Sequence, residues 1–487
     1  MLFNSHEFIF LFLPVMFFGY FYLTSKRLII GSKAWLVGGS LFFYGWWNVL
    51  YLPLILVSML VNYAIGTSLP KIEKEGGKHL SKRSLLAVGI IFNAGLLGYF
   101  KYTDFLLENF NGIFGSDVPL PHIVLPLAIS FFTFQQIAYL VDSYRNETKE
   151  YDLLNYALFV TFFPQLIAGP IVHHKEMMPQ FSSKWNLVKN YRNIALGLFI
   201  FSIGLFKKVV IADTFAKWAT QGFDHAETLN FFEAWATSLS YTFQLYFDFS
   251  GYTDMAIGAA LLFNIKLPIN FNSPYKARNI QDFWRRWHIT LSRFLRDYVY
   301  VPLGGNRSGK YRTYGNLFAT FLIGGLWHGA SWMFVIWGAM HGAAIVIHRI
   351  WQELGFRMWG WLGWLITFNF INVTWVFFRA EEMEDAWRVL RGMGGGGGVV
   401  LPGPVQTKLL FLETYGVQFG GWLSEVGGTL MLPLAILAGI FLQFLPNTLA
   451  ISNNKKYMGI KIFLAGALFS VGIFGLSGAS EFLYFNF

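Results

Sequence analysis

The sequence of 487 residues contains no cysteine, and charged residues are scarce. Without a thiol, the chain can form no disulfide, no thiolate nucleophile, no thiolate metal site and no palmitoyl attachment. Charged residues make up only 13% of the chain, about half the share usual in globular proteins. Hydrophobic residues reach 55%, more than one soluble core could bury. The chain is therefore predicted to be an integral membrane protein.

Long runs without charge predict an all-α membrane fold in one domain over residues 1–487, with roughly 10–13 membrane segments. The expected runs are Phe8–Thr24, two within Ala34–Pro70 that break near Asn48–Pro53, Ser84–Phe100, Val118–Val141, Leu153–Val172, Asn193–Asp213, Phe232–Ile265, Leu317–Ile347, Met358–Phe378, Leu430–Leu445 and Ile462–Ser480. Leu153–Val172 contains Pro164 and Gly169–Pro170, so we interpret it as a re-entrant segment. Between the runs we expect an acidic loop before Asp117, a short charged loop over Arg379–Arg391 and a flexible loop at about 392–425.

The net charge of +10 is concentrated at loops, which is typical of the cytoplasmic side of a membrane protein. This bias places the N-terminus outside and the loop 276–312, with nine basic residues, inside. Apolar residues recur at helical spacing within that loop, which predicts a helix lying in the membrane interface; they are Phe283, Trp284, Trp287, Leu291, Phe294 and Leu295. Its arginines either only set topology or bind the phosphates of a ligand such as coenzyme A.

His328 stands far from any charge, in a glycine-flanked stretch of an apolar run. Eleven helical residues before it would rise about 16 Å, roughly half of a ~30 Å hydrocarbon core. An ionisable side chain near mid-membrane is a candidate for catalysis, although a packing histidine bonded to a carbonyl fits equally. His288 in the basic loop is the second candidate.

The other polar residues have plainer interpretations. Asp248 and Asp254 lie in an apolar run, where they either pair with arginines or mark a polar pathway. His173 and His174 are expected in an interfacial loop. His341 and His348 share a helix face but have no third ligand at metal spacing, so we expect no metal site.

Several blocks of the sequence resemble the signature of the membrane-bound O-acyltransferases, and most closely the bacterial branch that contains alginate O-acetyltransferase membrane subunits. The blocks are Phe283–Ser292 (FWRRWHITLS), Leu295–Tyr298, Pro302–Arg307, Gln244–Met255 (QLYFDFSGYTDM), Gly324–Ala330 (GGLWHGA), Leu125–Gln135, Phe163–Pro170 and Phe377–Ala380. The resemblance implies many helices around a tunnel through the bilayer. It also implies that His328 is the catalytic histidine and His288 its companion.

The residues and the resemblance together predict an enzyme of the bacterial inner membrane that transfers an acetyl group from a cytoplasmic thioester, such as acetyl-CoA, for O-acetylation of an exported polysaccharide. We expect periplasmic partner acetyltransferases, no bound cofactor and no nucleic-acid partner. The predicted donor-binding residues are Arg285, Arg286, Trp287, Arg293 and Arg296; the candidates for lining the tunnel are Asp248, Asp254 and Trp327. Two alternatives remain open: a transporter with an Asp/His relay, and a scaffold subunit that docks a periplasmic enzyme through the aromatic tail Phe482–Phe487.

Overall fold

The protein is described by a computed structural model that covers residues 1–75, 81–148, 152–453, 458–476 and 483. Helices dominate it, as predicted, and the aromatic tail other than Leu483 lies outside the described residues. The helices of the first half are α1 (Leu13–Ser25), α2 (Ile29–Gly45), α3 (Leu52–Glu75), α4 (Lys82–Phe114), α5 (Ile129–Tyr144), α6 (Leu153–Thr161), α7 (Phe163–Leu166), α8 (His174–Ser182), α9 (Tyr191–Phe206), α10 (Asp213–Thr220) and α11 (Phe231–Leu262).

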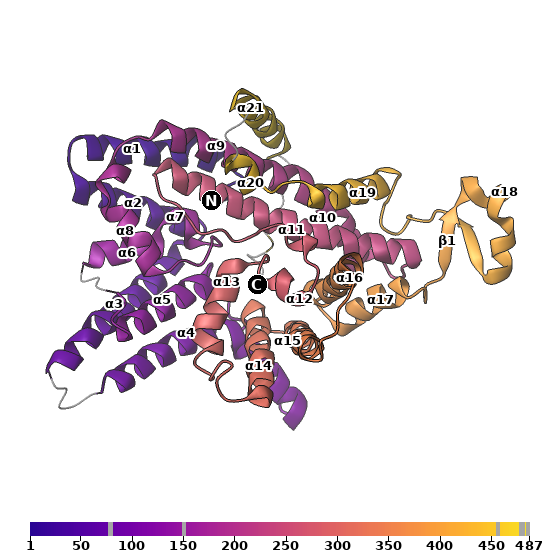
Figure 1. The fold of residues 1–487 in the computed structure, drawn as a ribbon, viewed down its shortest axis with the longest axis horizontal. Coiled ribbons are helices and arrows are strands. Elements are labelled where there is room, and N and C mark those ends of the chain that lie inside the picture. The colour runs from indigo at the N-terminus through magenta and orange to yellow at the C-terminus, as the bar shows by residue number, and fades with distance from the viewer. Residues whose placement is uncertain (76–80, 149–151, 454–457, 477–482, 484–487) are drawn as a thin grey trace.

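The second half contains shorter helices and one small sheet. Its elements are α12 (Ile280–Trp284), α13 (Ile289–Leu295), α14 (Lys310–His328), α15 (Trp332–Glu353), α16 (Gly360–Arg379), α17 (Met383–Met393), β1 (Val399–Pro402), α18 (Gln406–Leu409), β2 (Val417–Gly420), α19 (Met431–Phe444), α20 (Thr448–Asn453) and α21 (Met458–Gly475). The strands β1 and β2 pair in parallel, with Val399 opposite Val417. Thus the segment expected to be a flexible loop at 392–425 contains ordered elements, which project from one end of the helical body (Figure 1).

Six helical stretches in the described residues are long and apolar enough to cross a membrane. They are Glu7–Ser25, Val49–Ile72, Lys82–Phe114, Tyr191–His225, Trp332–Glu353 and Gly360–Arg379. The break predicted near Asn48–Pro53 is present, because α2 ends at Gly45 and α3 begins at Leu52. The membrane segment at Leu153–Val172 is likewise interrupted, between α6 and α7 at Phe162.

Three expectations about local structure are wrong. The acidic stretch before Asp117 is not a loop, since α4 continues to Phe114. The charged stretch after Arg379 folds as α17, whose apolar side packs beside α11. The basic loop holds no continuous interfacial helix, because α12 and α13 are separate short helices with the buried His288 at the bend between them.

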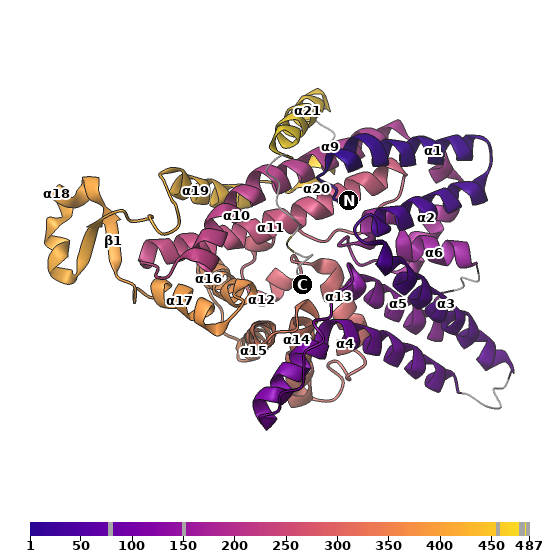
Figure 2. The ribbon, with the colours of Figure 1, turned by 180° about the vertical axis from the view of Figure 1, so that it is seen from behind.

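Small residues allow the central helices to approach closely. Gly204 and Gly251 face each other across α9 and α11, and a Cβ added to Gly204 would lie 2.6 Å from the Gly251 carbonyl oxygen. Gly325 and Gly338 make the equivalent contact between α14 and α15. Such close contacts between backbones are the usual packing of helices in lipid. Helix α13 lies near the middle of the molecule, and α14 lies below it, between α4 and α15 (Figures 1 and 2).

Candidate active site

His328 is the last residue of α14, and its side chain is 3% exposed. Aromatic rings surround the imidazole: the centroids of Trp327, Trp337 and Phe378 lie 4.9, 5.1 and 5.2 Å away. Gly329 leaves the helix in an extended conformation, and α15 begins at Trp332. The break in the uncharged run therefore comes directly after the histidine, which sits at a helix end inside an aromatic cage.

His288 is fully buried at the bend between α12 and α13 and has a left-handed backbone with φ +42°. A residue with a side chain rarely adopts this conformation, and residues that do so cluster at functional sites. Its Nδ1 lies 3.1 Å from Oδ1 of Asn270. The same oxygen accepts hydrogen bonds from the Thr290 amide at 3.2 Å and the Thr290 hydroxyl at 2.9 Å.

These contacts assign the tautomer of His288. The Thr290 amide can only donate, so the Asn270 atom that it meets is the carbonyl oxygen and not the amide nitrogen. His288 Nδ1 must then carry the hydrogen, which leaves Nε2 of the neutral ring as the basic nitrogen. Asn270 thus fixes the orientation of the His288 ring, with Nε2 on the side away from Asn270.

The two predicted catalytic histidines meet at one indole. The ring centroid of Trp327 lies 6.3 Å from that of His288 and 4.9 Å from that of His328. The fold thus brings together a bend in the basic loop and the end of α14. Two buried imidazoles beside an aromatic ring form a site suited to general acid–base chemistry on a substrate hydroxyl.

A row of stacked aromatic rings leads away from Trp327. Phe134 of α5 stacks on Trp327 at 5.0 Å and on Phe294 of α13 at 4.0 Å, and Phe294 contacts Tyr298 at 4.8 Å. Tyr298 in turn stacks on His173 at 5.7 Å. The row joins the histidine pair to a pocket of charged residues.

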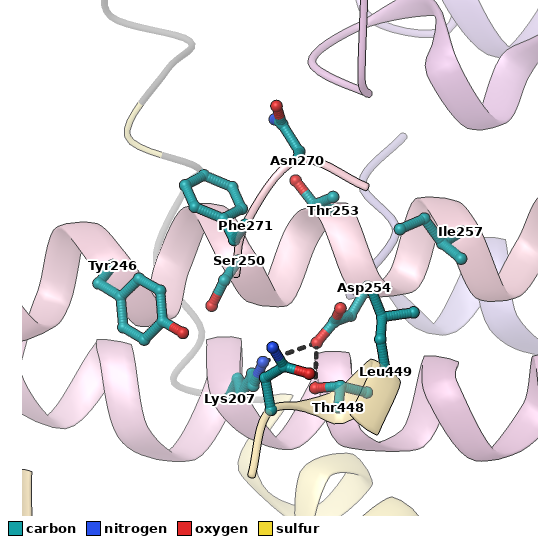
Figure 3. A pocket seen from close by; sticks show the side chains of 11 residues that line it. Lys207, Tyr246, Ser250, Thr253, Asp254, Ile257, Asn270, Phe271, Thr448 and Leu449 are labelled. Atoms are coloured by element: carbon teal, nitrogen blue, oxygen red, sulfur yellow. Dashed lines mark hydrogen bonds and ion pairs between the residues drawn. The ribbon is translucent and has the colours of Figure 1, made fainter. Parts of the chain in front are cut away.

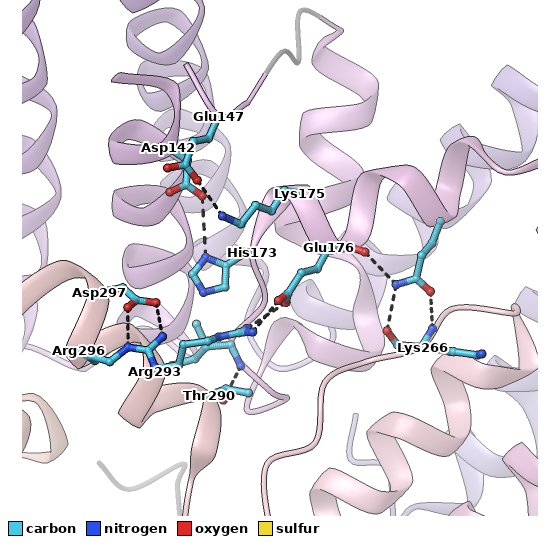
Figure 4. A network of polar contacts seen from close by, with 12 residues as sticks. Asp142, Glu147, His173, Lys175, Glu176, Lys266, Thr290, Arg293, Arg296 and Asp297 are labelled. Atoms are coloured by element: carbon cyan, nitrogen blue, oxygen red, sulfur yellow. Dashed lines mark hydrogen bonds and ion pairs between the residues drawn. The ribbon is translucent and has the colours of Figure 1, made fainter. Parts of the chain in front are cut away.

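This charged pocket has a volume of about 470 Å³ and is lined by residues that include Asp142, Arg145, Lys175, Glu176, Arg293 and Tyr298. Figure 4 shows its ion pairs: Arg293 contacts both oxygens of Glu176, and Lys175 contacts Glu147 at 2.7 Å. The Tyr298 phenol donates to Asp142 at 2.8 Å. Burial, reinforced by the Asp142 carboxylate, raises the pKa of Tyr298, so the phenol keeps the proton that it donates.

Only one of the five predicted donor-binding residues lines the charged pocket. Arg293 does so, whereas Arg285 is exposed elsewhere, Arg286 pairs with Asp282 at 2.8 Å and Arg296 pairs with Asp297 at 2.7 Å. Trp287 is the clearest correction, because it is 1% exposed and stacks on Phe283 at 5.7 Å in the core. Its ring packs among other aromatic side chains and does not line the charged pocket.

The buried aspartates pair with lysines and not with the arginines that we expected. Lys208 lies 2.8 Å from both Asp213 and Asp248, and Lys207 lies 2.7 Å from Asp254 (Figure 3). Lys207 and Lys208 begin a π-helical turn between α9 and α10, a geometry that is frequent at functional sites. The Lys207–Asp254 pair lines a cavity of about 10 Å³, enough for about one water molecule.

Three further histidines are buried away from the pair at Trp327. His173 and His174 are not interfacial loop residues, because both are buried, and burial lowers the pKa of His174 to about 4. His341 is also buried and contacts the Trp284 indole N–H at 3.2 Å and the Thr374 hydroxyl at 3.1 Å.

Asn270 and Lys101 are residues near the histidines that the sequence did not point to. The Lys101 ammonium of α4 donates to the backbone carbonyls of Trp327 and His328 at 2.6 and 3.0 Å. Lys101 directly follows the uncharged run Ser84–Phe100, and in the sequence it marks only the end of that membrane segment. Asn270 carried no signal, because its partners are recognised only from the folded backbone.

Comparison with known proteins gives consistent matches. Residues 140–381 match the model of the membrane-bound O-acyltransferase family, a range that includes both histidines. The peptidoglycan O-acetyltransferase of Helicobacter pylori is 51% identical over 100% of this chain and 98% of its own length. The probable alginate O-acetylase AlgI of Pseudomonas aeruginosa is 43% identical over 81% of this chain and 75% of its length. The teichoic acid D-alanyltransferase of Streptococcus thermophilus is 28% identical over 54% of this chain and 69% of its own length.

Proposed function

The chain belongs to the membrane-bound O-acyltransferase family and is a membrane enzyme, and from this premise we propose that it transfers an acetyl group from a thioester to a hydroxyl of an exported cell-envelope polysaccharide. The observation that carries the proposal is the placement of two buried histidines at Trp327, linked by stacked rings to a charged pocket. The relatives named for acetyl transfer to peptidoglycan and alginate support the choice of acyl group and acceptor.

His328 is proposed as the general base. It takes the proton from the acceptor hydroxyl while that oxygen attacks the thioester carbonyl. The carbon–sulfur bond breaks, and the departing thiolate receives the proton from the imidazolium. The products are an acetyl ester and a free thiol, with no covalent intermediate required on this chain. The acceptor attacks directly or through a nucleophile of a partner protein.

The donor is proposed to bind in the charged pocket, with acetyl-CoA as its simplest form. The pocket's cations are Arg145, Lys175 and Arg293. Lys175 and Arg293 pair with Glu147 and Glu176, so they would exchange these carboxylates for phosphate groups, with which arginine can form paired hydrogen bonds. The aromatic row from Tyr298 to Trp327 then marks the direction in which the thioester arm approaches His328. In this arrangement the pocket faces the cytoplasm, and the N-terminus lies on the periplasmic side of the inner membrane.

Peptidoglycan is our preferred acceptor. The relative named for it is similar over 100% of this chain, whereas the similarity to the alginate relative covers 81% of it. Periplasmic partner acetyltransferases are proposed to complete transfer to the polymer. Incubating the purified system with peptidoglycan fragments and, separately, with alginate tests this preference, because acetylation of alginate alone would contradict it.

The test of the mechanism compares wild type with His328→Ala in proteoliposomes supplied with labelled acetyl-CoA, acceptor and partner. Loss of the base should lower acetyl transfer by about 10²–10⁴-fold. His225→Ala, at an exposed histidine, is the matched control and should leave transfer unchanged. Full transfer by His328→Ala in an assembled complex would favour a scaffold role, and substrate flux without any donor would favour a transporter.

A further inference from the structure

The end of helix α14 is held by two neighbouring residues of α4. The Lys101 ammonium donates to the carbonyl oxygens of Trp327 and His328 at 2.6 and 3.0 Å, and the Tyr102 phenol donates to the carbonyl oxygen of Leu326. Three consecutive carbonyls of the helix that ends in His328 therefore accept hydrogen bonds from a helix more than 220 residues away in the sequence.

These carbonyls need an external donor. The last four carbonyls of any helix lack partners within the helix, and in a membrane protein no bulk water replaces them. A cation at this position also offsets the partial negative charge of the helix C-terminus. The contacts of Lys101 satisfy both needs.

No acidic side chain in the described part of the chain lies within ion-pair distance of Lys101. The ammonium also lies 3.5 Å from the Ser130 hydroxyl, at the start of α5. The ammonium is therefore directed at backbone and hydroxyl oxygens around His328. A lysine that served only to neutralise an aspartate, as Lys207 and Lys208 do, would have a carboxylate partner.

Helix α4 holds the other side of the same turn as well. Asn109 accepts a hydrogen bond from the Trp332 indole at 2.8 Å, and Phe105 contacts the Trp332 ring at 5.9 Å. Trp332 is the first residue of α15. One face of α4 thus fixes both ends of the connection from His328 to α15.

We infer that Lys101 is a positioning residue, which holds the backbone of His328 so that its imidazole keeps the geometry needed for catalysis. This inference rests on the proposed role of His328 as the base. Lys101 itself contacts no reacting atom. Its removal should therefore affect the rate of the chemical step and not the binding of the donor.

The first experiment measures acetyl transfer by the full-length protein in proteoliposomes for Lys101→Met and Lys101→Arg. A misplacement of about 1 Å in an active site can lower the rate by roughly 10²-fold. We expect that loss in kcat for Lys101→Met, with KM for acetyl-CoA unchanged within about twofold. Lys101→Arg should recover most of kcat, because guanidinium can donate to both carbonyls. Thr103→Ala is the control on the same helix, since among the described residues the Thr103 hydroxyl bonds only to the Tyr99 carbonyl of α4.

The second experiment uses the absence of cysteine, because Lys101→Cys would carry the chain's only thiol. Alkylation with 2-bromoethylamine converts that thiol into a lysine analogue with an ammonium, whereas iodoacetamide leaves a neutral amide. Mass spectrometry confirms the modification. Recovery of kcat with the ammonium, and much less recovery with the amide, would support a positioned cation even if Lys101→Met folds poorly.

The inference is overturned if Lys101→Met keeps the wild-type kcat while His328→Ala is inactive, or if both alkylated forms of Lys101→Cys have equal kcat. A change confined to KM would also contradict it. Activity in His328→Ala would instead refute the proposed function, so the two failures are distinguishable.

Discussion

Substitution of Gly325 by alanine should inactivate the enzyme although Gly325 contacts no reacting group. A Cβ added there would lie 2.4 Å from the Phe334 carbonyl oxygen and 2.9 Å from the Gly338 Cα. Both atoms belong to the backbone of α15, so no flexible side chain can move aside. The two helices must separate for the methyl group to fit.

The size of the effect follows from this contact. An ordinary contact begins at 3.4 Å, so α14 and α15 would have to move apart by about 1 Å. His328 lies one turn further along α14, and a misplacement of about 1 Å in an active site can cost roughly 10²-fold in rate. The overpacked interface should also lower the free energy of unfolding by about 1–3 kcal/mol.

The assay measures kcat in proteoliposomes, together with thermal unfolding followed by tryptophan fluorescence. Gly315→Ala is the matched control, since a Cβ at Gly315 on the same helix meets nothing within 4 Å. We expect Gly315→Ala to match the wild type in both measurements. If Gly325→Ala were as active as Gly315→Ala, the close helix contact would not position His328.

Three further predictions address other parts of the site. Asn270→Ala removes the acceptor that orients His288 and should lower kcat by about 10–100-fold in the transfer assay. If Asn270→Ala lowered kcat by the same factor in a His288→Ala background, Asn270 would not act through His288. Lys208→Met leaves two buried carboxylates without their cation and should reduce the free energy of unfolding by about 3–5 kcal/mol. Lys175→Met, which removes an exposed ion pair, should reduce it by less than about 1 kcal/mol. Melting curves that are the same for the two variants would refute this. Tyr298→Phe removes the hydroxyl that donates a hydrogen bond to Asp142 in the charged pocket. It should raise KM for acetyl-CoA about tenfold, a change worth about 1.4 kcal/mol of binding. An unchanged KM would mean that acetyl-CoA binds elsewhere.

The membrane character and most helices could be predicted from the sequence, because lipid demands long uncharged runs and helical backbone. The wrong predictions concern helices that contain charged residues. Helix α4 continues past Lys101 to Phe114, and α17 is a charged, amphipathic helix, so neither has the uniform hydrophobicity that reveals a span. The helical spacing in the basic loop predicted one continuous helix, but the left-handed backbone of His288 separates α12 from α13.

The histidine pair could be named from the sequence because an ionisable residue in an apolar run is conspicuous and the surrounding blocks resemble a known family. The donor residues could not be chosen in the same way. All three arginines form ion pairs, and charge alone does not distinguish Arg293, whose pair with Glu176 lies in the charged pocket, from Arg286 and Arg296, which do not line it. Ion pairing depends on where carboxylates lie in space.

The sequence by itself therefore determined that this chain is an α-helical membrane protein and that His288 and His328 are its candidate catalytic residues. Only the tertiary structure decided which nitrogen of His288 is basic, that Trp287 is buried, and that Lys101 holds the end of α14. The reason is physical: hydrophobicity is a local property that each run carries in its own residues. Hydrogen bonds such as that from Lys101 to His328 join groups 227 residues apart, and no local pattern records them.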